Sequence, residues 1–188
     1  MIFFIRLNIW DGDDRYMIEL KFELVQKEHL DCIVCMFTNA INEMKRNGID
    51  QWDSIYPDRK VIENDIEKKQ LFVGTYESII TSAYVINQEC DEQYLNGRWK
   101  YPNSRYYVVH RLCVNPIFQN RGIGMKTMIH IENELKKIGI DTIRLDAFTL
   151  NPYALKMYKR LGYSTVGIAN WRKGKFYLME KRIKDSKL

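Results

Sequence analysis

The chain lacks the cysteine and histidine clusters that disulfide frameworks and metal sites require. Its 188 residues include four cysteines and three histidines. Cys32 and Cys35 form a C-x-x-C motif, but no second pair or nearby histidine completes a zinc site. We therefore predict no metal and interpret Cys32 and Cys35 as small residues of a buried helix. The thiols are expected to be reduced, which is typical of a cytoplasmic protein.

Long apolar runs and long basic runs are also missing. The apolar start, MIFFIRLNIW, is too short to span a bilayer and runs into the acidic turn DGDD instead of a cleavage site. It therefore predicts neither a membrane anchor nor a signal peptide. The 29 basic and 24 acidic residues are scattered, and the net charge of +5 favours anionic ligands without defining a nucleic-acid surface. Neither nucleic acid nor membrane is expected as a partner.

No internal repeat, linker or low-complexity tract divides the chain, and its 46% hydrophobic content suffices for one core. We predict one domain over residues 17–183, preceded by an extension over residues 1–16 and followed by a tail over residues 184–188. Met17 begins the first convincing strand. The hypothesis is that translation starts there and that residues 1–16 lie upstream of the natural start.

The apolar patterns predict strands and helices in a mixed order. Residues 17–25 alternate between apolar and polar, as a strand with one buried face does, whereas residues 30–44 carry apolar side chains at helical spacing until Gly48. Further strands are predicted over residues 71–77, 79–87, 106–114, 141–148, 163–169 and 175–183, further helices over 59–69, 124–138 and 152–161, and a loop over 87–104. This order predicts an α/β protein with a mixed sheet in one layered domain.

The stretch NPIFQNRGIGMKTM, Asn115 to Met128, joins a predicted strand to a predicted helix through two glycines. A helix N-terminus leaves backbone N–H groups unpaired and carries about half a positive charge. The bare turn at Gly122 and Gly124 therefore suits a phosphate, and Arg121 adds a full charge. Alternatively, the glycines only let the helix pack closely on the sheet. Neither the third glycine of a dinucleotide fingerprint nor the G-K-S or G-K-T of a P-loop follows.

A second motif, NPYALKMYKRLGY, describes one short helix with both of its boundaries marked. Asn151 is a helix N-cap, Pro152 takes the favoured first helical position, and Gly162 is a C-terminal stop. Tyr158 falls on the apolar face of this helix. Core packing of an amphipathic tyrosine explains that position as well as a functional role does.

Together the two motifs resemble the acetyl-CoA-binding core of the GNAT acyltransferase superfamily. V-x-P-x-x-Q-x-R-G-x-G runs from Val114 to Gly124, and N-x-x-A-x-x-x-Y-x-x-x-G-Y follows from Asn151 to Tyr163. The resemblance covers about residues 17–183. It implies a small, bacterial-type N-acetyltransferase with acetyl-CoA as co-substrate, built on a central, mostly antiparallel sheet flanked by helices.

The resemblance implies that the cofactor lies along the strand end and the glycine turn. The pantetheine arm would pair with the end of strand 106–114, and a separation from strand 141–148 would make room for it. The pyrophosphate would lie on the amides of the turn, and Asn151 would hydrogen-bond the cofactor, although its capping role also explains it. The implied residues are Leu112, Cys113, Val114, Gln119, Asn120, Arg121, Gly122, Ile123, Gly124, Lys126, Thr127, Asn151 and Tyr158.

The chemistry needs a base for the acceptor amine, a donor for the oxyanion and an acid for the departing thiolate. The backbone N–H of Val114 is expected to bind the oxyanion. Tyr158, near the cofactor sulfur in the resemblance, is expected to be the acid. The base stays open between His110, Glu77 and a water, and a histidine satisfied within the sheet is the alternative for His110. Cys113 lies near the cofactor path, but the resemblance favours direct attack over a thiol intermediate.

The loop GIDQWDSIYP, residues 48–57, resembles a Q-W-x-x-x-Y-P segment found in a subset of bacterial GNAT proteins. Trp52, Asp53 and Tyr56 are candidates to frame a cationic acceptor with ring faces and a carboxylate, and Glu77 is a further acceptor-site candidate. The alternative is a packing loop that Trp52 and Tyr56 anchor to the core.

The predicted function is transfer of an acetyl group from acetyl-CoA to a primary amine of a small molecule or peptide, by direct attack in a ternary complex. The alternative is a module of the same fold that senses or sequesters acyl-CoA without efficient transfer. Both a monomer and a homodimer stay open, because such a sheet leaves strand edges exposed.

Overall fold

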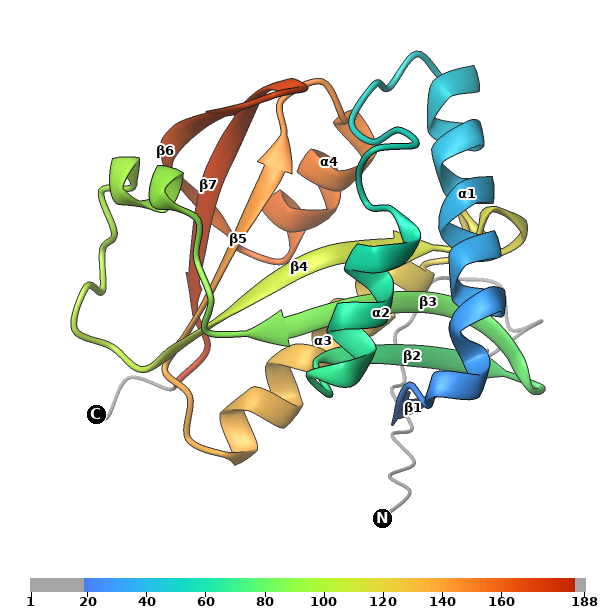
Figure 1. The fold of residues 1–188 in the computed structure, drawn as a ribbon. Coiled ribbons are helices and arrows are strands. Elements are labelled where there is room, and N and C mark those ends of the chain that lie inside the picture. Colours follow the sequence, from blue (N-terminus) through green and yellow to red (C-terminus); the bar gives the residue numbers. More distant parts are fainter. Residues whose placement is uncertain (1–18, 185–188) are drawn as a thin grey trace.

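A seven-stranded sheet with strand order β1-β2-β3-β4-β5-β7-β6 runs through the molecule (Figure 1). The computed structural model describes residues 19–184. The predicted extension over residues 1–16, its boundary at Met17 and residues 185–188 of the predicted tail lie outside the described residues. The strands are β1 (Lys21–Leu24), β2 (Leu71–Tyr76), β3 (Ile79–Asn87), β4 (Tyr106–Val114), β5 (Thr142–Phe148), β6 (Ser164–Trp171) and β7 (Gly174–Arg182).

Helices cover both faces of this sheet, as Figure 1 shows for α1 and α2 on one face and α3 on the other. The α-helices are α1 (Leu30–Arg46), α2 (Arg59–Glu67), α3 (Ile123–Lys137) and α4 (Pro152–Arg160), and the 3-10 helices are η1 (Lys27–His29), η2 (Glu92–Asn96) and η3 (Pro116–Phe118). One core cluster joins α1 and α2 to β2 and β3, and another joins α3 and α4 to β5. The predicted order of elements and the mixed α/β class are confirmed.

One pair of strands in the middle of the sheet is parallel and only half formed. β4 pairs with β5 from Tyr106 to Val109, opposite Thr142 to Leu145, and no farther. Beyond that point β4 stays paired with β3, while β5 stays paired with β7. The sheet therefore opens between β4 and β5, where the family resemblance implies a separation.

The C-x-x-C motif does not lie in the core. Cys32 and Cys35 are exposed on the outer side of α1, so the prediction that they are buried is wrong. The inner side of the helix is occupied by Ile33, Met36 and Phe37, which pack on the sheet. Because α1 buries only one stripe and Cys32 and Cys35 lie outside it, both cysteines point to solvent.

A buried ion pair fixes the connection between β3 and β4 to the sheet. Arg144 of β5 contacts Glu180 of β7 at 3.4 Å, with side chains 7% and 1% exposed. The guanidinium carbon lies 4.3 Å from the ring centre of Trp99 and 3.8 Å from that of Tyr106. The backbone N–H of Lys100 also donates to Glu180, at 2.8 Å. The carboxylate and the two rings thus compensate the charge of Arg144, and the Lys100 N–H stabilises the carboxylate.

Replacement of Arg144 by leucine is expected to lower the free energy of unfolding by about 3–5 kcal/mol, because it leaves the carboxylate of Glu180 buried without its partner. Urea denaturation measures this change. Arg46→Ala is the matched control, because Arg46 pairs with Glu43 on the exposed face of α1 and is expected to contribute at most about 0.5 kcal/mol. Equal effects of the two substitutions would contradict the assigned role of Arg144.

Candidate active site

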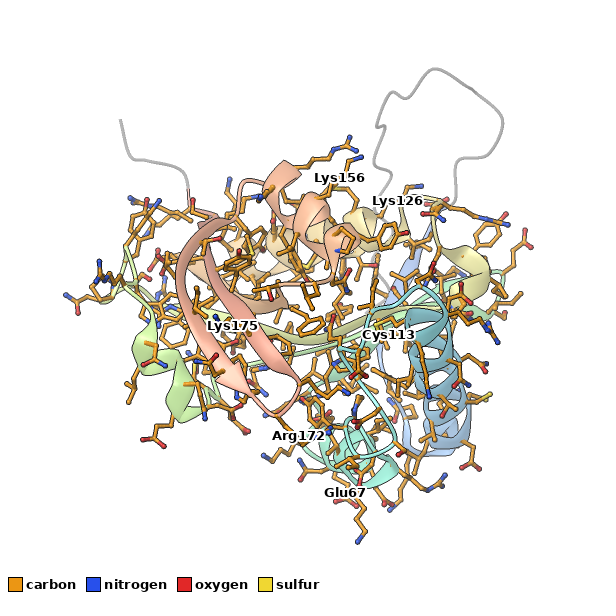
Figure 2. The ribbon with its side chains drawn as sticks, turned by 90° about the horizontal axis from the view of Figure 1, so that it is seen from above. Glu67, Cys113, Lys126, Lys156, Arg172 and Lys175 are labelled. Carbon is orange, nitrogen blue, oxygen red and sulfur yellow. The ribbon has the colours of Figure 1, made fainter. Side chains whose placement is uncertain are left out.

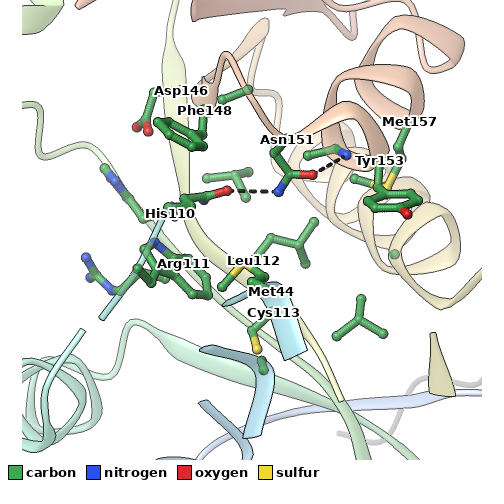
Figure 3. Close-up of a pocket in the computed structure, with 18 of the residues that line it drawn as sticks. Met44, His110, Arg111, Leu112, Cys113, Asp146, Phe148, Asn151, Tyr153 and Met157 are labelled. Atoms are coloured by element: carbon green, nitrogen blue, oxygen red, sulfur yellow. Dashed lines mark hydrogen bonds between the residues drawn. The ribbon is translucent and has the colours of Figure 1, made fainter. Parts of the chain in front are cut away.

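A cleft of about 2220 Å³ lies where β4 and β5 separate. Its walls come from β4, the β5 end, the start of α3, the exposed side of α4 and the loop between α1 and α2. Figure 3 shows His110 to Cys113 of β4 facing Asp146 and Phe148 of β5, with Asn151 beyond them. The half-formed strand pair thus builds the site.

One end of the cleft is basic. Arg121 and Lys126 lie at the start of α3, and Lys156 and Arg160 reach the same cleft from α4. Figure 2 shows Lys126 and Lys156 on the same side of the molecule. Lys156 and Arg160 are not among the residues predicted from the sequence, although their spacing of four places them on one helix face. This end can hold several negative charges next to the N-terminus of α3.

Different structural constraints explain why glycine occupies positions 122 and 124 of the first motif. Gly122 is the N-cap of α3 and has φ +74°, a conformation that glycine adopts without steric cost, and a Cβ there would meet nothing within 4 Å. At Gly124, a Cβ would lie 3.0 Å from Met157 Sδ and 3.5 Å from Val114 Cγ2. Close packing thus accounts for Gly124, whereas the left-handed backbone conformation accounts for Gly122.

Other residues of the same motif divide between the cleft and the core. The residues of this motif that line the cleft are Gln119, Asn120, Arg121, Gly122, Ile123, Gly124 and Lys126. Thr127 does not: its hydroxyl lies in the core, 2.9 Å from Ser82 Oγ and 2.9 Å from the Ile123 carbonyl. The prediction that Thr127 lies at the phosphate is therefore wrong, because its position in the helix turns it toward β3.

The backbone of β4 offers hydrogen-bonding groups to the cleft. Asn115 N–H donates to the Thr81 carbonyl at 2.9 Å, and Val114 stands opposite Ser82 in the same register. Antiparallel neighbours alternate between residues that bond across the pair and residues that point away from it. The N–H and C=O of Val114 therefore point away from β3, toward the side that β5 has left.

Tyr158 is buried on α4 and reaches the cleft wall. Burial, with a smaller contribution from Asp146, raises its pKa above the usual value. No hydrogen-bond partner for its hydroxyl is found within residues 19–184. The phenol is therefore protonated at neutral pH and has its proton available to a group in the cleft.

Asp146 is a functional candidate that no sequence motif indicates. It lies on β5 just beyond the last residue paired with β4, and it lines the cleft. Burial raises the pKa of its carboxyl to about 6, and the hydroxyl of Tyr94 donates to Oδ1 at 2.8 Å. In the sequence it is one more polar residue of an alternating strand. Because the sheet opens at this point, Asp146 lies in the wall of the cleft.

His110 also faces the cleft, as a neutral imidazole. Its Nε2 lies 3.0 Å from Asn87 Oδ1, and that amide is oriented by its own donation to Gln70 Oε1. Nε2 therefore carries the hydrogen in this contact. Burial, with the nearby charge of Arg111, lowers the pKa of His110 to about 4. It is a much weaker base than its sequence position suggests.

Arg111 occupies a bulge of β4 and connects this strand to α2 and to the loop between α1 and α2. Arg111 and Leu112 both stand opposite Tyr84, and Arg111 has φ +51°. Its guanidinium makes two hydrogen bonds to Asp65, at 2.7 and 2.9 Å, and a third to the hydroxyl of Tyr56 at 2.7 Å. This bidentate contact stabilises a backbone conformation that costs about 1–3 kcal/mol in a non-glycine residue.

The predicted acceptor residues fall into two groups. Trp52 and Tyr56 line the cleft, and Trp52 also packs 5.6 Å from the ring of Phe37. Asp53 does not line it, because Arg172 binds both of its carboxylate oxygens, at 2.7 and 2.8 Å, and lowers its pKa. Glu77 lies in the turn between β2 and β3, away from the cleft-lining residues. The acceptor contacts predicted for Asp53 and Glu77 are not supported.

Asn151 uses both ends of its side-chain amide inside the protein. Its Oδ1 accepts from the Ala154 N–H at 3.1 Å, which is the predicted helix cap, and its Nδ2 donates to Gln51 Oε1 at 2.9 Å. These contacts join α4 to the loop between α1 and α2 (Figure 3). The capping alternative therefore explains Asn151 at this position, although it also lines the cleft.

Residues 19–184 contain neither a candidate metal site nor a helix that could cross a membrane. No three His, Cys, Asp or Glu side chains gather there in a way that suits a metal ion. No helix in that part of the chain has the length and apolar character needed to cross a membrane.

Comparison with known proteins gives consistent matches. The sequence model of the acetyltransferase (GNAT) family matches residues 53–163. A ribosomal protein bS18-alanine N-acetyltransferase of Escherichia coli K12 is 30% identical over 61 residues, which are 32% of this chain and 41% of that protein. The chain thus spans well under half the length of this curated relative.

Solved structures share the fold over nearly the whole chain. A GNAT family acetyltransferase of Streptococcus agalactiae 2603 superimposes with a TM-score of 0.79 and 23% identity, over 91% of this chain and 99% of that one. The yncA protein of Salmonella typhimurium, solved with its cofactor acetyl-CoA, has a TM-score of 0.63 and 13% identity, over 90% of this chain and 96% of that one.

The four cysteines are expected to differ in their reaction with iodoacetamide at pH 8. Cys113 is buried, and burial raises its pKa to about 12, so only about one thiol in ten thousand is ionised at that pH. Cys32, Cys35 and Cys90 are exposed. Intact mass is expected to show three adducts in the folded protein and four after unfolding in urea. Rapid addition of a fourth adduct to the folded protein would contradict the burial of Cys113.

Proposed function

Because this chain belongs to the GNAT family of acetyltransferases, we propose that it transfers the acetyl group of acetyl-CoA to a primary amine by direct attack in a ternary complex. The predicted family and fold are both confirmed by the matches to sequence and structure. One observation gives this proposal its main support. A single cleft combines a basic end, an open strand edge and two groups, Asp146 and Tyr158, that can take and give a proton.

The basic end supports binding of the nucleotide part of acetyl-CoA. The free N–H groups at the start of α3 suit the pyrophosphate, and Arg121 and Lys126 add positive charge beside it. Lys156 and Arg160 of α4 are candidates for a further phosphate. The pantetheine arm carries amide groups of its own, and the outward-facing backbone of Val114 suits them because it has lost a neighbouring strand.

The open part of the cleft supports the transfer step. Acetyl-CoA supplies the acetyl group as a thioester. Asp146 takes the proton of the acceptor ammonium, so that the neutral amine can attack the thioester carbonyl. The Val114 N–H stabilises the negative charge that develops on the carbonyl oxygen. As the carbon–sulfur bond breaks, Tyr158 donates its proton to the departing thiolate, which leaves as coenzyme A, and the surplus proton of the attacking nitrogen returns to the Tyr158 phenolate to give the neutral amide.

Asp146 is a better base than His110, the first candidate from the sequence. Both groups line the cleft, but the pKa of Asp146 is raised to about 6 and that of His110 is lowered to about 4. An effective general base has a pKa near the working pH. The hydrogen bond of His110 to Asn87 also supports the alternative of a histidine satisfied within the sheet.

The acceptor side supports an amine of a small molecule or a peptide. Aromatic rings of Tyr56 and Trp171 and the carboxyl groups of Asp91 and Asp146 line this part of the cleft. Rings and carboxylates together suit a cationic amine. The bS18-alanine relative makes a peptide with N-terminal alanine a rational member of an acceptor panel. A cytoplasmic location and a monomeric or homodimeric state stay predictions.

Two variants are expected to affect acetyl-CoA binding and turnover separately. Gly122→Glu places a carboxylate at the proposed phosphate site and is expected to weaken acetyl-CoA binding at least about tenfold in calorimetric titration. Tyr158→Phe is expected to retain binding and to slow coenzyme A release across an amine panel about a hundredfold. Gly122→Asn controls for the backbone, because asparagine tolerates this conformation.

The alternative function, a sensing module, predicts different results in the same measurements. It predicts acetyl-CoA binding that Gly122→Glu disrupts, but no coenzyme A release above background with any amine. Absence of acetyl-CoA binding to the wild-type protein would contradict both readings.

The kcat/KM of the wild-type enzyme is expected to fall as the pH drops below about 6. Protonation of a base with a raised pKa of about 6 removes the active form below that pH. Asp146→Asn is expected to be about a hundredfold slower and to lack this inflection. His110→Gln is expected to retain it, because His110 titrates near 4. An inflection that survives in Asp146→Asn and disappears in His110→Gln would reverse the assignment of the base.

A further inference from the structure

The long connection between β3 and β4 contributes to the cleft as well as linking two strands. Its 3-10 helix η2 (Glu92–Asn96) carries Tyr94, whose hydroxyl donates to Asp146 Oδ1 at 2.8 Å. Tyr94 is only 5% exposed, and it lines the cleft together with Cys90 and Asp91 of the same connection. The sequence pattern of this connection predicts only a loop. The structure brings one of its side chains to the carboxyl that faces the reaction.

Packing holds the ring of Tyr94 from two sides. Trp99 stacks on it with ring centres 5.8 Å apart, and Trp171 of β6 lies at 6.2 Å. The indole N–H of Trp99 donates to the Tyr94 carbonyl at 3.0 Å, which closes the connection on itself. Gly97 permits this closure, because a Cβ there would lie 2.5 Å from the Trp99 ring. The hydroxyl of Tyr94 is therefore delivered by a fixed scaffold.

We infer that Tyr94 is a positioning residue of the transfer reaction: its hydroxyl fixes Asp146 Oδ1 and leaves Oδ2 to accept the proton of the acceptor amine. This inference rests on the proposed role of Asp146 as the base. No other side chain within residues 19–184 donates a hydrogen bond to this carboxyl. A carboxylate with one oxygen held and one oxygen available has a defined direction for proton transfer, which catalysis by a general base requires.

The hydrogen bond also acts on the charge of Asp146. Burial and the neighbouring Asp91 raise the pKa of Asp146, whereas the Tyr94 hydrogen bond and the charge of Arg111 lower it. The Tyr94 hydroxyl thus favours the ionised form that a base needs. The other ionisable groups that line the cleft around this carboxyl are Tyr56 of the loop between α1 and α2, Cys90, His110 of β4 and Tyr158 of α4.

Tyr94→Phe tests the inference, because it keeps the ring and its stacking and removes only the hydroxyl. Loss of the donor is expected to raise the pKa of Asp146 by about one unit, since a hydrogen bond to a charged group favours that charge. Carbon-13 NMR of aspartate-labelled protein follows this titration without an acceptor, and Asp146→Asn identifies the signal. Tyr101→Phe is the matched control, because no hydrogen-bond partner for its hydroxyl is found within residues 19–184.

The kinetic readout uses whichever amine gives coenzyme A release. In Tyr94→Phe, the inflection of kcat/KM is expected to move upward from about pH 6 by about one unit, with kcat lowered about tenfold and acetyl-CoA affinity unchanged. A variant that is less stable or slower, but in which both the NMR titration and the inflection stay at the wild-type pH, would overturn the positioning role.

The same measurements separate this inference from the proposed function. If Asp146→Asn abolishes the inflection while Tyr94→Phe leaves it in place, Asp146 is the base and Tyr94 does not position it. If Asp146→Asn leaves both rate and inflection unchanged, the proposed base is wrong and the inference about Tyr94 falls with it. A shift in Tyr94→Phe alone, with Tyr101→Phe at the wild-type value, supports the inference.

Discussion

The end of the β4–β5 pairing after Val109 and Leu145 is the constraint on which the rest of the structure depends. A sheet that opens in its middle exposes backbone groups that an ordinary sheet would pair, and buried backbone groups need partners. Those groups on β4 form the edge at which the pantetheine arm is proposed to bind. The same opening turns Asp146 from a position inside a sheet into a wall of the cleft.

An open sheet also has to be held together elsewhere. The loop over residues 48–57 does this, because it contacts both halves. Its Asp53 binds Arg172 in the turn between β6 and β7 at 2.7 Å, and its Gln51 accepts a hydrogen bond from Asn151 at the start of α4. Exposed ion pairs contribute little stability individually. Their effect here is geometric, since they set the distance between the two walls of the cleft.

Burial is the common cause of the unusual protonation states around the cleft. It raises the pKa of Asp146, Tyr158 and Cys113 and lowers that of His110, because removal from water disfavours every charged form. The consequences differ with the chemistry of each group. The pKa of Asp146 stays near the working pH. The Tyr158 phenol stays protonated and can donate, and the Cys113 thiol stays protonated and is therefore a poor nucleophile. One physical effect thus separates the proposed base, the proposed acid and an unreactive thiol.

The sequence by itself determined the order of elements, the family and the cofactor motifs, because periodicity, helix caps and glycine turns are local signals. It did not determine which polar side chains meet. Asp146 and Tyr94 come together from positions 52 residues apart, and Asp53 and Thr127 are drawn into structural contacts with distant elements. Cys32 and Cys35 point outward because α1 buries only one stripe. Such outcomes depend on strand register and helix rotation, which only the packed structure decides.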